Sequence, residues 1–243
     1  MIDFFHTVLY TPIYNLLIGL TDILPGYDIG LAVVVATLIV KVIIMPLSFA
    51  ALRTQRSIKA MEPEMKRIRE ELKDDKEAQA KAMFALYKEY NVNPFAGLLT
   101  LIIQLPIVLS LYWVFNSKTL LSVDTALLYS FIPVPEAISP LFLGVFAITG
   151  ASVILALLAG LTQLVYGWYA IPVPEKSTKA PGTDMQADFG RAMALQMRYA
   201  LPLFIIAAAY FTSVAIALYF ITSNLVGILQ EFVVRRQKIR PTA

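Results

Sequence analysis

Long apolar segments with very few charged residues constrain the fold of this chain more than any other feature. They cover residues 29–51, 95–115, 140–169 and 199–234. A helix needs about 20 apolar residues to cross a hydrocarbon core of about 30 Å, so the last segment is long enough for two helices, with a turn near Thr212 and Ser213. The segments do not alternate with period two, which favours helices over a barrel. We therefore expect an all-α membrane protein with five transmembrane helices.

Composition supports a membrane location and excludes several kinds of chemistry. Hydrophobic residues make up 58% of the chain and charged residues 15%, and the mean hydropathy is +0.69. Because Cys is absent, disulfides, thiol catalysis and Cys-ligated zinc are excluded. With His6 as the only histidine and no His/Asp/Glu cluster, we expect no metal site. No nucleotide-binding motif is present, and we expect no cofactor, no covalent catalysis and no nucleic-acid substrate.

The distribution of positive charge predicts the orientation. Eighteen of the 20 Lys and Arg residues lie in the segments 53–92, 171–199 and 235–243. A five-helix topology puts these three segments on one side of the membrane. The positive-inside rule makes that side cytoplasmic, with the N-terminus outside and the C-terminus in the cytoplasm.

Two regions outside the apolar segments have their own helical patterns. Residues 1–28 predict a helix lying in the outer interface, with a sixth span as the alternative. In residues 53–92, apolar side chains recur at steps of three and four on both sides of a polar turn at 73–76, which predicts an antiparallel helical hairpin. Its mixed charges indicate a solvated surface, with partner docking as a second interpretation.

The expected order along the chain is as follows. It runs through an outer-face interfacial helix (1–28), TM helix 1 (29–52), the cytoplasmic helical hairpin (53–92), TM helix 2 (93–116), an outer loop (117–139), TM helix 3 (140–169), a cytoplasmic loop (170–198), TM helix 4 (199–212), TM helix 5 (213–234) and a basic cytoplasmic tail (235–243).

Lys41 in the first apolar segment needs a physical explanation. A charge at the centre of a span costs about 2.5–3.5 kcal/mol, and no span offers a buried acid as its partner. A wet cavity lined by polar side chains is the cheapest way to hold it. The candidate lining residues are Thr37, Lys41, Ser48, Thr100, Gln104, Thr162, Gln163, Tyr219, Thr222, Ser223 and Asn224. For each polar residue alone, a role in joining helices is the competing interpretation.

Several motifs together resemble a known family. LIVKVIIMPLS is followed by PEM, ALYK, NP, QLPI and LYW in this order, and the last span contains ALYFITSNL. This series is similar to the YidC membrane-protein insertases, over roughly residues 29–236. The resemblance implies five helices around a groove open to the cytoplasm and to lipid. In the family a positive residue of the groove, usually arginine, attracts polar parts of a substrate, and Lys41 occupies that position here.

The resemblance implies a membrane insertase or chaperone that moves hydrophobic segments of nascent proteins into the bilayer of the bacterial inner membrane. Its partners would be these substrates and lipid, and contact with the Sec translocon or the ribosome stays open. The rival hypothesis is a small channel or secondary transporter, which would also explain a polar site within the membrane. Such transporters commonly carry internal repeats, and none is visible in this sequence.

Overall fold

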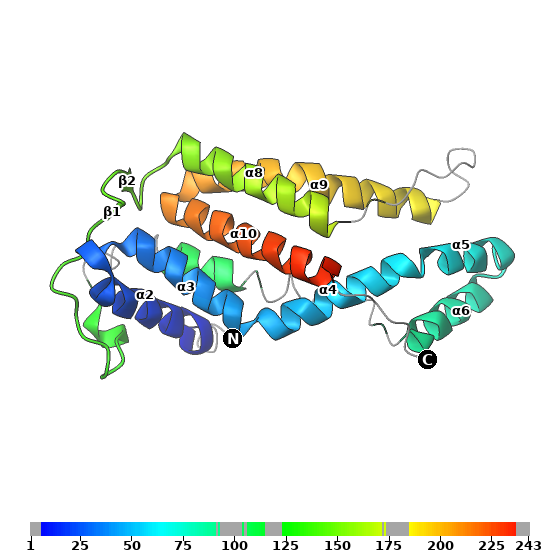
Figure 1. The fold of residues 1–243 in the computed structure, drawn as a ribbon, viewed down its shortest axis with the longest axis horizontal. Coiled ribbons are helices and arrows are strands. Elements are labelled where there is room, and N and C mark those ends of the chain that lie inside the picture. Colours follow the sequence, from blue (N-terminus) through cyan, green and yellow to red (C-terminus); the bar gives the residue numbers. More distant parts are fainter. Residues whose placement is uncertain are drawn as a thin grey trace. The chain divides into compact units, whose positions relative to one another are not determined.

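The computed structural model describes residues 6–90, 92, 104, 106–114, 123–171, 173 and 185–236, and these are mostly helical (Figure 1). The chain divides into two compact units. The first unit consists of Met1–Ile43 and Leu105–Leu229, and the second of Ile44–Gln104 and Gln230–Ala243. The expectation of a predominantly helical chain is confirmed.

Three of the described helices are long and apolar enough to cross a membrane. These are α8 (Val153–Ala170), the part of α9 (Met185–Thr212) from Gly190 onwards, and α10 (Val214–Arg236). A fourth span results if α3 (Ile29–Ile43) and α4 (Met45–Ala60) are counted together. The described part of the chain therefore contains three or four candidate membrane-spanning helices.

The first predicted span differs from the observed helices, because the structure interrupts it at Ile44. Residues 29–52 were expected to form one helix, whereas α3 ends at Ile43 and α4 begins at Met45. Pro46 in the first turn of α4 explains the break. Proline has no N–H to donate to the carbonyl of Val42, and its ring would clash with that carbonyl in a continuous helix.

In the first unit, Asp28 starts α3 and holds a distant loop. One carboxylate oxygen accepts hydrogen bonds from the backbone N–H groups of Gly30 at 2.8 Å and Leu31 at 3.0 Å, which caps the helix. The other oxygen accepts the N–H of Leu143 at 2.7 Å. Asp28 is 5% exposed, so this carboxylate belongs to the interior of the unit. Asp28 thus joins the start of α3 to the β1–β2 region through its two carboxylate oxygens.

The helix α2 (Thr11–Ile23) follows the short π-helix His6–Tyr10 and packs against α3. The Tyr14 side chain of α2 is fully buried. Its hydroxyl accepts a hydrogen bond from the N–H of Asp124 at 2.8 Å, and burial raises the pKa of the phenol. Asn15 likewise binds the loop, through the Leu127 carbonyl and the Tyr129 N–H. The polar face of α2 therefore holds residues 124–129, including the 3-10 turn Thr125–Leu127.

Residues 140–152 form a turn region instead of the first part of a span. The strands β1 (Leu141–Phe142) and β2 (Phe146–Ala147) pair as an antiparallel hairpin. At its tip Leu143 and Gly144 both have positive φ, which is the geometry of the turns that join twisted strands. The helix expected from residue 140 therefore begins at Val153, where the Ser152 hydroxyl accepts the N–H of Leu155.

The helices α8, α9 and α10 pack closely because small residues lie at their contacts. A side chain at Gly160 of α8 would come within 2.2 Å of Ile206 on α9, and one at Gly227 of α10 within 2.7 Å of Tyr166 on α8. Small residues of this kind let helices approach each other in lipid. The first N–H groups of α10, from Val214 and Ala215, donate to the carbonyls of Gly150 and Ile148. Figure 1 shows α8 and α9 running side by side.

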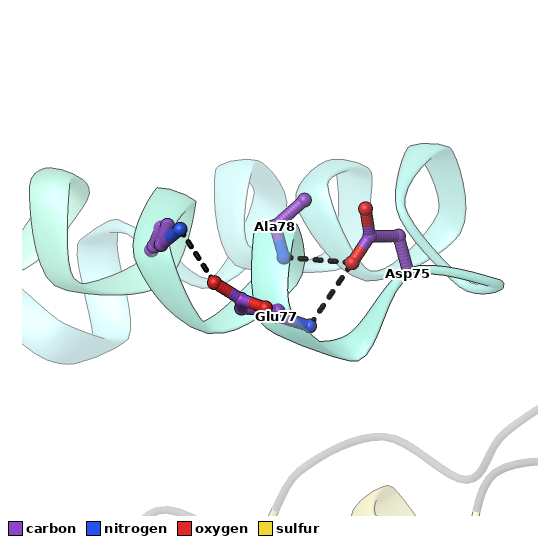
Figure 2. A network of polar contacts seen from close by, with 4 residues as sticks. Asp75, Glu77 and Ala78 are labelled. Atoms are coloured by element: carbon purple, nitrogen blue, oxygen red, sulfur yellow. Dashed lines mark hydrogen bonds and ion pairs between the residues drawn. The ribbon is translucent and has the colours of Figure 1, made fainter.

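In the second unit, α5 (Glu62–Glu71) and α6 (Lys76–Glu89) follow α4 and pack against each other. Their shared core contains Met61, Met65, Leu86 and Val92, with partly buried Ile58, Ile68, Met83, Tyr87 and Tyr90 around it. The Tyr90 hydroxyl donates to the Glu64 carboxylate at 2.6 Å, and this hydrogen bond raises the pKa of the phenol. Asp75 caps α6 by accepting the N–H groups of Glu77 and Ala78 (Figure 2).

Candidate functional site

Lys41 lies in the last turn of α3, three residues before the break at Ile44. Its side chain is half-buried, and it forms no hydrogen bond or ion pair with any residue that the structure describes. The carbonyl end of a helix favours a nearby positive charge, so the break after Ile43 offers Lys41 a partial electrostatic partner. The sequence alone suggested a position deep within one continuous helix. The ammonium group is instead held at the end of a helix without an acidic neighbour in the described region.

Thr37 shares a face of α3 with Lys41, but its hydroxyl serves the helix itself. The side chain is 4% exposed, and the hydroxyl donates to the carbonyl of Val33 at 2.7 Å. Such bonds to the preceding turn satisfy a hydroxyl without any outside partner. While it makes this bond, the Thr37 oxygen keeps its acceptor lone pairs for another donor.

A second set of candidates meets between α8 and α10. Asn224 donates from Nδ2 to the Thr162 hydroxyl at 3.2 Å and to the Ala159 carbonyl at 3.5 Å. The Thr162 hydroxyl in turn donates to the same carbonyl at 2.9 Å. Of the remaining candidates on these helices, Gln163, Tyr219, Thr222 and Ser223 are all buried. The structure thus brings residues 62 positions apart into one polar contact.

The other candidates belong to the second unit or lie outside the described residues. Ser48 is half-buried on α4, and its hydroxyl donates to the Ile44 carbonyl at 3.1 Å. Gln104 is half-buried and engaged in an interaction of its own. Thr100 falls outside the part of the chain that the structure describes. The predicted set is therefore divided, with Thr37, Lys41 and the α8–α10 residues in the first unit.

Sequence reasoning missed an ion-pair cluster at the end of α10. Glu231 is 4% exposed and faces two arginines, with Arg56 Nη2 at 3.6 Å and Arg235 Nε at 3.7 Å from its Oε2. Arg56 also donates from Nη1 to the Val234 carbonyl at 2.5 Å. All four residues belong to the second unit. The signal was present in the sequence, because Glu231 is the single acid in the apolar stretch 199–234.

Within the described residues, no group of three or more His, Asp or Glu side chains gathers where a metal ion could bind. The chemistry that the described candidates offer is electrostatic and hydrogen-bonding. The first unit contains a lysine without an acidic partner among the described residues, as well as polar contacts between apolar helices. The second unit, taken by itself, contains a buried ion pair.

Comparison with known proteins gives one family profile and relatives that share one name. The profile of the family described as "60Kd inner membrane protein" matches residues 20–241. A protein of Clostridium tetani named membrane protein insertase YidC is 30% identical over 219 residues, which cover 90% of this chain and 87% of that protein. A protein of the same name from Francisella tularensis subsp. novicida is 30% identical over 207 residues, which cover 85% of this chain but 32% of that protein. The chain thus spans most of the first relative and about a third of the second.

Proposed function

Because the chain belongs to the 60Kd inner membrane protein family, we propose that it is a membrane protein insertase. It moves hydrophobic segments of newly made proteins from the cytoplasm into the lipid bilayer. The observation that carries this assignment is the family match over residues 20–241, together with two relatives named as insertases. A channel or transporter is not favoured, because no finding beyond a polar site points to one.

We propose that five helices span the bilayer of the bacterial inner membrane. Support comes from α8, α9, α10 and the α3–α4 pair, which have the length and apolar character of four spans. The apolar sequence of segment 93–116 makes it our candidate for the fifth. The charge distribution supports an outer N-terminus and a cytoplasmic C-terminus. In this arrangement the Asp28 cap and residues 124–150 face outside, and α5 and α6 face the cytoplasm.

Lys41 carries the proposed mechanism. A half-buried ammonium group without an acidic partner among the described residues is stabilised by any anionic group that comes near. At an effective dielectric constant near 20, two unit charges 4 Å apart attract by about 4 kcal/mol. An acidic residue in the polar flank of a substrate would therefore be held at Lys41 while its apolar segment passes into lipid. The site must stay hydrated, because a dry lysine loses its proton.

The free energy for insertion comes from the substrate. Each buried methylene contributes about 0.8 kcal/mol, so a typical apolar segment enters lipid without nucleotide hydrolysis. The protein lowers the barrier for the polar flank by shortening its path through hydrocarbon and by offering a countercharge. Candidate residues lining this path are those near Lys41 and those at the α8–α10 contact. The α5–α6 pair receives substrates or partners from the cytoplasm, and the ribosome and the Sec translocon are candidates for that role.

Reconstitution of the purified chain into liposomes tests the function directly. A small single-spanning substrate with an acidic flank should become protected from external protease, at a rate well above that in empty liposomes. Ion flux through the same liposomes is measured in parallel. Flux without insertion would support the channel hypothesis and contradict the insertase.

A further inference from the structure

The contact between Arg56 and the end of α10 is long-range and buried, which sets it apart from ordinary surface ion pairs. Arg56 lies on α4, and its two partners, Glu231 and Val234, follow it by 175 and 178 positions in the chain. The exposed fraction of the side chain is 19% for Arg56 and 5% for Glu231. A pair as desolvated as this is retained only where its geometry satisfies both charges.

Arg56 satisfies two different groups at once. One nitrogen of the guanidinium pairs with the Glu231 carboxylate, and another donates to the carbonyl of Val234. Since α10 ends at Arg236, this carbonyl is one of the last four of the helix, which have no partner within it. A cation at this end is also favoured by the helix dipole. Arg56 therefore caps α10 from a separate helix.

The same helix that carries Arg56 also contributes to the core of the α5–α6 pair. Ile58, two residues after Arg56, packs against the cluster formed by Met61, Met65, Leu86 and Val92. One turn of α4 thus contacts α10 through Arg56 and the α5–α6 core through Ile58. Displacement of this turn would move the helix pair with it.

From these contacts we propose that Arg56 is a positioning residue, which fixes α4 on the last turns of α10 and so sets the position of the α5–α6 pair. Arg235 does not share this role, although it faces the same carboxylate. It lies four residues from Glu231 on the same helix, and 45% of its side chain is exposed. Its ion pair with Glu231 therefore lies within α10. The role of Arg56 in positioning α4 is independent of the proposed function. The expected effect of Arg56 on insertion rests on the proposed function.

The absence of cysteine makes the geometry measurable by site-directed spin labelling. Labels at Ala85→Cys on α6 and Val233→Cys on α10 occupy exposed positions of the second unit. Electron double resonance in lipid nanodiscs should give a single narrow distance distribution. Arg56→Ala and Glu231→Gln should each broaden it about twofold, because the helix pair then samples several positions. Arg56→Lys should broaden it less than Arg56→Ala, since the ammonium keeps the charge but lacks the two separate nitrogens with which the guanidinium reaches Glu231 and Val234.

Arg235→Ala is the matched control, because it also removes an arginine that pairs with the Glu231 carboxylate. It should leave the distance distribution unchanged. An unchanged distribution in both Arg56→Ala and Arg56→Lys would overturn the proposal, as would equal broadening in Arg235→Ala. Insertion into liposomes is measured on the same variants and should fall in the order of the broadening. If the unsubstituted chain inserts no substrate, the proposed function fails, while the distance distributions still decide the role of Arg56. Broadening without any loss of insertion would contradict a positioning role in that function.

Discussion

At the residue scale, the burial of Lys41 opposes the charge of its ammonium group, because a buried charge loses contact with water. The side chain is long enough to reach water from a half-buried position, which lowers the cost of keeping its charge. Its place in the last turn of α3 lowers that cost further, because the helix end carries partial negative charge. Neither effect requires the geometry of one fixed partner. A lysine at this point therefore suits a diffuse attraction to substrates of varying sequence.

We expect Lys41→Arg to retain insertion and Lys41→Ala to slow it about tenfold for substrates with an acidic flank, which corresponds to about 1.4 kcal/mol of barrier. Lys41→Glu should slow these substrates more, because it adds repulsion. Protease protection of substrates in liposomes measures the rate. Lys81→Ala removes an exposed lysine of a surface pair and serves as the control. Normal insertion of acidic substrates by Lys41→Glu would contradict the proposed role of the charge.

The contact between Thr162 and Asn224 allows the lining and the helix-joining interpretations to be separated. Thr162→Val keeps the shape of the side chain and removes the hydroxyl that accepts from Asn224. Because hydrogen bonds between membrane helices contribute about 0.6 kcal/mol on average, we expect a small decrease in thermal stability in detergent. Serine at the same position should restore it. A variant with unchanged stability but slower insertion would show that the hydroxyl acts on the substrate instead.

At the scale of elements, the α5–α6 pair shows which local signals determine a helix that is not among the candidate membrane spans. Asp75 accepts two backbone N–H groups in the first turn of α6, whereas the Lys81–Glu77 pair is highly exposed at both ends (Figure 2). An N-cap contributes about 1 kcal/mol, and an exposed pair of this spacing about 0.3–0.5 kcal/mol. The cap is therefore the stronger of the two.

Asp75→Ala should increase the rate of amide hydrogen exchange in α6 about fivefold, as expected for a loss of about 1 kcal/mol. Lys81→Gln, which removes the exposed pair and keeps the acidic residue in the first turn of α6, should change exchange by less than half as much on the free-energy scale. Asp75→Asn is the conservative comparison, because asparagine also caps helices. Equal exchange rates in Asp75→Ala and the unsubstituted chain would show that packing against α5 alone holds this helix.

Hydropathy predicted where apolar helices occur but not where they begin. The helix α9 starts at Met185, well before the apolar stretch at 199, because helix formation needs backbone hydrogen bonds and not apolar side chains. Conversely, residues 140–152 are apolar but form a strand hairpin, and its turn depends on Gly144 and on a bond from Leu143 to Asp28. The break at Ile44 was readable in Pro46. Long-range pairs such as Arg56–Glu231 depend on tertiary contacts that no local pattern encodes.

At the scale of the whole molecule, charge asymmetry is the property from which we infer the orientation of the chain. Eighteen of the 20 Lys and Arg residues lie in three segments, which alternate with the apolar segments so that all three would reach the same side in the proposed five-helix arrangement. In the opposite orientation these segments would have to cross hydrocarbon, which the membrane potential and anionic lipids of the inner leaflet oppose. The proposed orientation thus rests on the sum of many small terms, and no single lysine determines it.

This orientation predicts a labelling pattern that single cysteines can test on a chain without any of its own. Ala137 and Ala85 are both exposed alanines, the first in the loop before β1 and the second on α6. In intact cells, a membrane-impermeant maleimide should label Ala137→Cys, whereas Ala85→Cys should react only after the membrane is opened. Equal labelling of both after opening controls for accessibility. The reverse pattern would place Asp28 and its loop in the cytoplasm, and the α5–α6 pair could then no longer receive substrates from that side.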